Sequence, residues 1–313
     1  MRPGVLERLG LTYEVMAERN PRIIVSRATG WGHLGPDAES QVGSMDILAQ
    51  ARGGVMNVTG TPETGALPVG VPFADHVGAI VSAYGMMVAL WERERSGIGQ
   101  EVNTSLYGAQ LCIQGFNITA AMWHDREQQH VDPDRRRPHW NAYPCADGKL
   151  LQIGGPVADR WWDGFCDVID APDLAQDGRY TANMRDEQLR ERTIHRLREV
   201  FVARPRDEWL ELLQPEYFVQ PVSSYLEIAE DPQAWANGYL TNVPVEGGDP
   251  VPTVGTPVNL SRTPGGVRHL APELGQHTEQ VLVDAGYNWD DITALREAGA
   301  FGELPTATDA AGD

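Results

Sequence analysis

Apolar positions in the first part of the chain alternate between helical spacing and short continuous runs. A helix is predicted before the turn at Pro21, and the run at residues 23–25 then predicts a buried strand of the parallel type. Residues 75–95 carry apolar side chains three and four positions apart, which predicts one face of a long helix. That face consists of Val77, Ile80, Val81, Tyr84, Val88 and Trp91. A second strand (QEVNTSL) and another helical stretch follow, so an α/β layer is indicated.

The apolar periodicity stops at residues 124–139, where charged residues and prolines replace it. This stretch is therefore the best linker candidate. Beyond it, a strand with a turn at Asp147 and Gly148 precedes amphipathic runs at 161–169 and 187–202, which predicts a smaller α+β unit. The expected organisation is a large α/β domain (1–123), a linker (124–139), a small α+β domain (140–250) and a return segment with a final helical stretch that completes the large domain (251–313).

Composition narrows the class of protein. The 313 residues are 42% hydrophobic, which is ample for buried cores. No uncharged apolar run approaches the ~20 residues of a bilayer-spanning helix, and the N-terminus lacks a signal-peptide pattern, so we expect a cytoplasmic protein. The net charge of −19 opposes binding to nucleic acids and to anionic membranes. It is also compatible with a salt-rich cytoplasm.

Several kinds of active site lack their sequence signatures. The three cysteines form no C-x-x-C pair, and the eight histidines show no metal-ligand spacing, so no metal is expected. Neither a dinucleotide fingerprint, a P-loop nor a G-x-S-x-G motif occurs. We therefore expect no bound cofactor.

Three positions remain as candidates for chemistry. Asp75 lies at the start of the long predicted helix, where the helix dipole stabilises a carboxylate, and its role could be structural or catalytic. Asp46 opens another predicted helix, which Gly53 and Gly54 end, and by itself is a capping residue. Gly154 and Gly155, followed by Pro156, form either a tight turn or a set of backbone N–H donors for an anion.

Six stretches, in order, resemble one family. They are RPGVLERLGL, NPRIIVSRATGWGHLGP, the block from D-I-L-A-Q to G-G-V-M-N-V-T-G, VGVPFADHVGA, ALWERERSGIGQEVNTSL and GQHTEQVLVDAGYNWDDITALREAG. Together they are similar to the family III CoA transferases, which include formyl-CoA transferase, carnitine CoA-transferase and α-methylacyl-CoA racemase. The resemblance runs from the first residues to near Phe301.

The resemblance implies an activity and a site. Asp75 would attack an acyl-CoA thioester, forming an aspartyl anhydride and then an aspartyl-CoA thioester before transfer to a small carboxylic acid. A carboxylate needs no general base for this attack. The glycine-rich loop would be Gly154, Gly155 and Pro156. CoA contacts would come from Arg2, Arg8, Gly43, Ser44, Met45 and Asp46. CoA itself is anionic, so an acidic protein would need such local donors.

The same resemblance implies a Rossmann-like large domain and an interlocked homodimer. The family's N-terminal segment, which carries the first strands of that layer, has no counterpart in this sequence, so an incomplete large domain is expected. A non-catalytic or partner-dependent protein is the alternative function. The racemase branch is the third, but it has a histidine where this chain has Met45, and methionine cannot move a proton.

Overall fold

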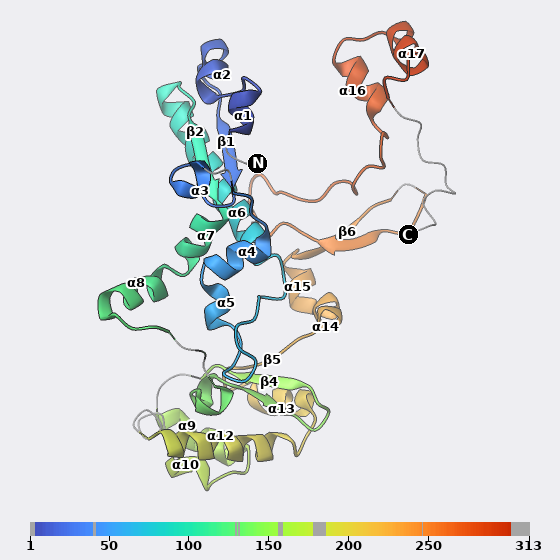
Figure 1. Cartoon of the computed structure of the whole chain (residues 1–313). Coiled ribbons are helices and arrows are strands. Elements are labelled where there is room, and N and C mark those ends of the chain that lie inside the picture. The colour runs from blue at the N-terminus through green and yellow to red at the C-terminus, as the bar shows by residue number, and fades with distance from the viewer. Residues whose placement is uncertain are drawn as a thin grey trace. The chain divides into compact units, whose positions relative to one another are not determined.

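The computed structural model describes residues 4–39, 42–128, 130, 132–155, 159–177, 186–245 and 247–301 (Figure 1). The chain divides into two compact units, Met1–Val222 and Ser223–Asp313. Each contains helices and short strands, which agrees with the expected mixed α/β class.

The first unit begins with a pair of parallel strands. β1 (Val25–Thr29) pairs with β2 (Glu101–Ser105), from Val25 opposite Glu101 to Thr29 opposite Ser105. Both strands were predicted from the sequence and are confirmed. A parallel pair needs a long connection, and here it contains α3 (Pro36–Glu39), α4 (Asp46–Arg52), α5 (Val55–Val58) and α6 (Phe73–Ser96). The other helices of this region are α1 (Val5–Arg8), α2 (Tyr13–Arg19), α7 (Leu106–Ile113) and α8 (Gly115–His124).

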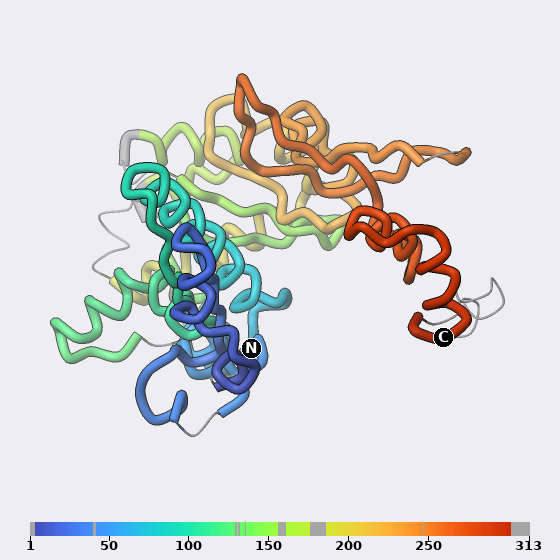
Figure 2. The backbone as a smooth tube through the Cα atoms, turned by 90° about the horizontal axis from the view of Figure 1, so that it is seen from above, coloured from blue at the N-terminus to red at the C-terminus, as the bar shows by residue number. Residues whose placement is uncertain are grey.

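Helix α6 is the predicted long helix, but it packs through small residues. A Cβ atom on Gly78 would lie 2.8 Å from Leu106 Cδ2, and one on Gly85 would lie 2.7 Å from Val102 Cγ1. Between them, the Ser82 and Thr104 hydroxyls are 2.6 Å apart. The helix therefore runs in close contact with β2 and α7 (Figure 2).

The large apolar side chains predicted to form one face of α6 are mostly exposed. Ile80, Tyr84 and Trp91 keep 69%, 71% and 62% of their surface. Helical periodicity located the helix correctly, but the small residues form its buried face because they allow the backbone to approach β2. By length and composition alone, α6 is also apolar enough to cross a membrane, and a single such helix is weak evidence for a membrane span.

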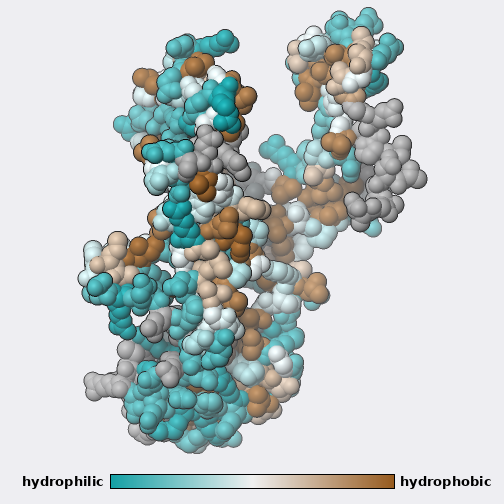
Figure 3. Space-filling view, in the orientation of Figure 1, coloured by the Kyte–Doolittle hydropathy of each residue, from teal (hydrophilic) through white to brown (hydrophobic). Residues whose placement is uncertain are grey.

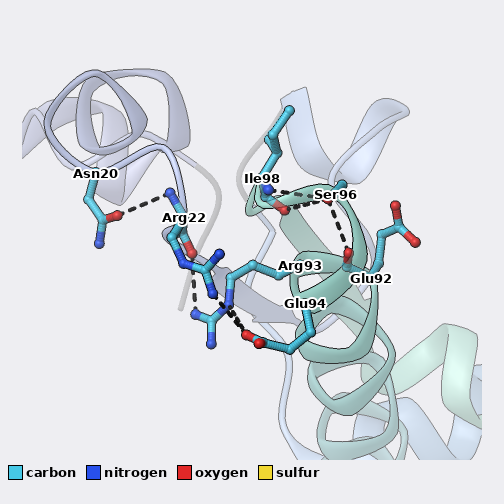
Figure 4. Close-up of polar contacts among 7 residues, drawn as sticks. All are labelled: Asn20, Arg22, Glu92, Arg93, Glu94, Ser96 and Ile98. Carbon is cyan, nitrogen blue, oxygen red and sulfur yellow. Dashed lines mark hydrogen bonds and ion pairs between the residues drawn. The ribbon is translucent and has the colours of Figure 1, made fainter.

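The C-terminal end of α6 is joined to the turn before β1 (Figure 4). Arg22 forms an ion pair with Glu94 at 2.8 Å, and the Arg93 side chain donates to the Arg22 carbonyl at 3.3 Å. Gly97 ends the helix with φ 76°, a left-handed conformation that favours glycine. Ser96 Oγ accepts from the Ile98 N–H at 3.2 Å. These contacts fix the start of β1 against the end of α6.

The later part of the first unit, Ala142–Pro221, which we call the small domain, is built on a three-stranded antiparallel sheet. The strand order is β3 (Ala142–Pro144), β4 (Leu150–Ile153) and β5 (Val219–Pro221). The turn at Gly148 has φ 75°, as the predicted strand–turn pattern requires. Its helices are α9 (Asp159–Val168), α10 (Leu174–Asp177), α12 (Glu187–Phe201) and α13 (Arg206–Leu213). Of two 3₁₀ turns, η1 (Pro133–Arg135) lies in the predicted linker and η2 (Pro138–Trp140) crosses its end.

A continuous hydrophobic core lies inside this small domain, extending from Tyr143 to Val219. Trp162 is fully buried and its indole N–H donates to the Leu174 carbonyl at 2.7 Å. Trp209 donates to the Phe201 carbonyl at 2.9 Å. Each buried indole thus has a partner, as a well-packed core requires.

The second unit contains α14 (Tyr225–Glu230), α15 (Pro232–Ala236), the antiparallel strands β6 (Leu240–Val243) and β7 (Val251–Val254), α16 (Thr278–Asp284) and α17 (Trp289–Glu297). The final helical segment was predicted as one stretch. It is two helices, because Gly286 has φ 95° and Asn288 starts a new helix with a capping box. The predicted domain limits differ from the two compact units and remain predictions.

Candidate active site

Asp75 is the third residue of α6, on the first turn of the helix, and is exposed. The residue before the helix is Pro72, which provides no side-chain acceptor for the free N–H groups of that turn. Another part of the chain must therefore satisfy them.

Asp46 supplies this cap from a different helix. Its Oδ1 accepts hydrogen bonds from the backbone N–H of Ala74 at 2.7 Å and of Asp75 at 3.1 Å. These are the N–H groups that an N-cap side chain normally binds. Asp46 was predicted as a capping residue at its own helix and does start α4, but its carboxylate stabilises the start of α6.

Gln50, one turn further along α4 and almost fully buried, extends this arrangement. Its amide donates to Asp46 Oδ2 at 2.7 Å and to the Val71 carbonyl at 3.3 Å. Its Oε1 accepts from the Val69 N–H at 2.9 Å. Asp46 and Gln50 together fix the segment from residue 69 to Asp75, which leaves the Asp75 carboxylate free to point outward.

The predicted CoA contacts divide into two places. Gly43, Ser44 and Met45 directly precede α4, and the Met45 side chain is 70% exposed. Arg8 is exposed at the end of α1. Arg2 lies outside the described residues. The structure thus brings Asp46 to the start of α6, beside Asp75, while Arg8 comes from a separate element.

The glycine loop belongs to the small domain. The Gly154 N–H donates to the Phe218 carbonyl at 2.8 Å, and the Gly155 N–H donates to the His139 carbonyl at 3.0 Å. A Cβ atom on Gly155 would lie 2.7 Å from the Trp161 ring, so glycine is needed there. Both predicted donors therefore have backbone partners in this structure. Pro156 lies outside the described residues.

Two residues of this region were missed by the sequence reasoning. Gln50 is four positions after Asp46, a spacing that places both on one helix face and could have indicated a pair. Trp31 follows the predicted strand β1, and its indole N–H donates to the Gly43 carbonyl at 3.1 Å. Nothing in the local sequence pattern links Trp31 to Gly43.

Among the described residues, no group of three or more His, Cys, Asp or Glu side chains could hold a metal ion, whether near Asp75 or elsewhere. A cavity of about 1320 Å³ lies beside α8, lined by residues such as Phe116, His124 and Glu127. None of the predicted site residues lines it. Asp75 itself is exposed.

A family model named CoA-transferase family III matches residues 1–278. The chain belongs to this family. The prediction that it is an enzyme of CoA-transferase type is thereby confirmed. The geometry agrees with it in one respect, since a carboxylate presented on a capped helix start is suited to attack a carbonyl carbon.

Relatives with described activities are similar over most of this chain. The (R)-2-hydroxy-4-methylpentanoate CoA-transferase of Clostridioides difficile is 28% identical, over 95% of this chain and 74% of the relative. The succinyl-CoA–D-citramalate CoA-transferase of Chloroflexus aurantiacus is 30% identical, over 94% of this chain and 73% of the relative. The chain thus spans roughly three quarters of the length of each relative.

A solved structure shows the same fold. A CAIB/BAIF family protein from Brucella suis superposes with a TM-score of 0.74 at 24% identity, covering 90% of this chain and 72% of that one. At this identity the likeness concerns the fold alone.

Proposed function

We propose that this chain transfers CoA from an acyl-CoA donor to a carboxylic acid, with Asp75 as the nucleophile. The observation that carries the proposal is the exposed Asp75 carboxylate at the start of α6, held there by the bonds from Asp46. Membership of CoA-transferase family III supports the reaction type.

The steps need no external base. A carboxylate oxygen of Asp75 attacks the thioester carbonyl, the C–S bond breaks, and an anhydride and CoA thiolate form. The thiolate then attacks the Asp75 carbonyl carbon, which releases the donor acid and leaves an aspartyl-CoA thioester. The acceptor carboxylate attacks this thioester, and the thiolate released in turn attacks the acceptor carbonyl. The new acyl-CoA leaves and the Asp75 carboxylate is restored, without net transfer of a proton.

The surrounding residues have separate parts in this proposal. Gly43, Ser44, Met45 and Asp46, with Arg8 and Arg2, bind the CoA portion. Gly154 and Gly155 would stabilise the oxyanion of each addition step, an effect worth ~3–4 kcal/mol per lost donor in other enzymes. Because their N–H groups now bind the Phe218 and His139 carbonyls, this role requires those two bonds to open. No cofactor besides the CoA thioester enters the reaction.

Substrate choice is proposed at the level of chemical class. The relatives are named for hydroxy acids and dicarboxylic acids, including formyl-CoA:oxalate and succinyl-CoA:mesaconate transfer. We therefore propose small carboxylic acids of this kind as acceptors.

Two copies of the chain would associate in the interlocked dimer that the family resemblance implies, within the cytoplasm. The exposed apolar side chains of α6, such as Tyr84 and Trp91, support such an interface. The parallel β1–β2 pair with its helical connection supports a Rossmann-like large domain. Sedimentation velocity on the purified chain tests the dimer.

The reaction is tested by trapping the intermediate. The chain is incubated with succinyl-CoA, formyl-CoA and a branched acyl-CoA, treated with hydroxylamine, and digested for mass spectrometry. A hydroxamate on the Asp75 peptide is the expected result. Asp75→Asn should remove the adduct and lower turnover by at least ~10³-fold, as expected for loss of a nucleophile.

Asp290→Asn is the matched control, because Asp290 is also an exposed aspartate in the first turn of a helix. It should leave adduct and turnover unchanged. Absence of an adduct with every donor, in a folded protein, would favour the non-catalytic or partner-dependent alternative. Exchange of the donor's α-proton with deuterium would instead favour the racemase reaction, which Met45 opposes.

A further inference from the structure

Arg52, the last residue of α4, contacts Asp37 and Trp31, which both lie in the segment between β1 and this helix. Its Nη1 donates to Asp37 Oδ2 at 2.5 Å. Its guanidinium carbon lies 4.7 Å from the centre of the Trp31 ring and 5.2 Å from that of Tyr107. Trp31 in turn binds the Gly43 carbonyl through its indole N–H.

The Gly43 end of the segment is held closely against the end of β1. A Cβ atom on Gly30 would lie only 2.1 Å from Ser44 Cβ, so the backbone at Gly30 touches this residue directly. The hydrogen bond from the Trp31 indole to the Gly43 carbonyl, at 3.1 Å, joins the residue after Gly30 to the residue before Ser44. Gly43 and Ser44 are therefore positioned by the two residues that follow β1, through one steric contact and one hydrogen bond.

Arg52 packs against the face of the Trp31 ring. The guanidinium stacks on the indole, and Trp31 and Tyr107 meet edge to face at 6.1 Å. A planar guanidinium can stack and form a directed hydrogen bond at the same time, which a lysine ammonium cannot do equally well. The ion pair with Asp37 is partly exposed and by itself contributes little. Arg52 therefore acts on this segment through both contacts, and only the stacking reaches Trp31.

We propose that Arg52 and Trp31 are positioning residues that hold Gly43 and Ser44 in place for the CoA portion of the substrate. The identity of the ligand rests on the proposed function. Neither residue donates to the 69–75 segment in the described contacts, where Asp46 and Gln50 act instead. The two residues therefore set the affinity for CoA rather than the rate of attack by Asp75.

The test compares Trp31→Phe, Arg52→Ala and Arg52→Lys, with Arg95→Ala as the matched control. Trp31→Phe keeps an aromatic ring but removes the N–H. Arg95 stacks on Trp91 at 4.7 Å near the C-terminal end of α6, so its loss removes the same kind of contact away from Gly43. Titration calorimetry with free CoA measures affinity, and steady-state kinetics with succinyl-CoA separate KM from kcat.

Trp31→Phe and Arg52→Ala should each weaken CoA binding about five- to tenfold, the size of one lost hydrogen bond or stacking contact, and raise KM similarly. The value of kcat should change less than twofold. Arg52→Lys should lie between Arg52→Ala and the unchanged protein, and Arg95→Ala should match the unchanged protein. Equal loss in kcat and kcat/KM would overturn the proposal, because it would place these residues in the chemical step.

Hydrogen exchange gives a readout that is independent of catalysis. Peptides covering residues 42–46 should exchange faster in Trp31→Phe and Arg52→Ala but not in Arg95→Ala. Unchanged exchange in both variants would overturn the positioning role. If the unchanged protein itself fails to bind CoA, the proposed function fails, and the exchange data still decide whether Arg52 and Trp31 hold Gly43 and Ser44.

Discussion

The small domain and the region that carries Asp75 bury their side chains in different ways. In the small domain, the aromatic residues Tyr143, Trp162, Phe165 and Phe201 have no exposed surface. Around α4, α6 and α7 the buried apolar residues are instead alanines, namely Ala49, Ala74, Ala89 and Ala109. Brown apolar patches lie over the surface near α4 to α6, whereas the surface over α9, α10 and α12 is mostly teal (Figure 3).

This difference shows two ways of obtaining a defined structure. The small domain gains stability from burial of large apolar surfaces, at ~25 cal/mol per Å². The Asp75 region is organised by close backbone contacts and by hydrogen bonds such as those of Asp46 and Gln50. Its large apolar side chains remain exposed to solvent in the single chain. For this reason we propose that a second copy of the chain packs against them. Stability and site geometry should therefore respond to different substitutions.

The largest expected effect is on stability, from Phe201→Ala. Phe201 is fully buried between Tyr143 and Trp209, with ring centres 5.3 and 5.2 Å away. Its truncation should lower the free energy of unfolding of the small domain by about 3–5 kcal/mol. Urea melts followed by tryptophan fluorescence measure this change.

Tyr84→Ser is the comparison in the other region. Tyr84 keeps 71% of its surface, and tyrosine and serine have similar helix propensities. At dilute protein its effect on unfolding should stay within ~0.5 kcal/mol, while self-association weakens. A loss comparable to that of Phe201→Ala in the monomer would show that this face is already packed within one chain.

A smaller effect is expected from removing the cap of α6. Asp46→Ala leaves the Ala74 and Asp75 N–H groups without their acceptor and should cost about 1–2 kcal/mol. Transfer should also slow, because the first turn that presents Asp75 loses its anchor. Initial rates and thermal melts of the same sample measure both.

Asp46→Asn is the matched variant, since an amide oxygen can still accept from these N–H groups. It should retain part of the stability and part of the rate, because its amide nitrogen cannot accept the hydrogen bond from Gln50. Equal transfer rates for the unchanged protein, Asp46→Ala and Asp46→Asn would contradict the positioning of Asp75 by Asp46.

Much of the framework could be predicted from the sequence. Strands β1 and β2 and helix α6 follow from apolar runs and periodicity, and the Gly148 turn from its residue type. These features depend on local preferences, which neighbouring residues encode. The break at Gly286 depends on a single left-handed glycine and was missed.

The contacts that shape the site depend on residues far apart in the sequence. Asp46 binds N–H groups 28 and 29 positions away, and Trp31 meets a carbonyl 12 positions away. Helical periodicity also predicted that the large apolar side chains of α6 form its packed face. The residues in contact with β2 and α7 are instead Gly78, Ser82 and Gly85. Small side chains allow such approach, but hydrophobic patterns give them little weight.

The last expected effect is absent at neutral pH and appears only at alkaline pH, as a pH dependence of the stability of the small domain. Burial raises the pKa of the Cys145 thiol to about 11 and that of Cys166 to about 12, from an ordinary value of 9.0. Burial also raises the pKa of Tyr143, whose hydroxyl donates to the Pro138 carbonyl at 2.8 Å. At alkaline pH the folded state thus holds protons that the unfolded state has lost.

The stability of the small domain is therefore complete below pH 9.0 and should fall as the pH rises toward about 11 and 12. Urea midpoints across this range measure the fall. A Cys145→Ala, Cys166→Ala double variant, less stable throughout, should delay its onset to above the ordinary tyrosine value of 10.0, where Tyr143 begins to contribute. An unchanged onset would show that these thiols do not link proton binding to folding.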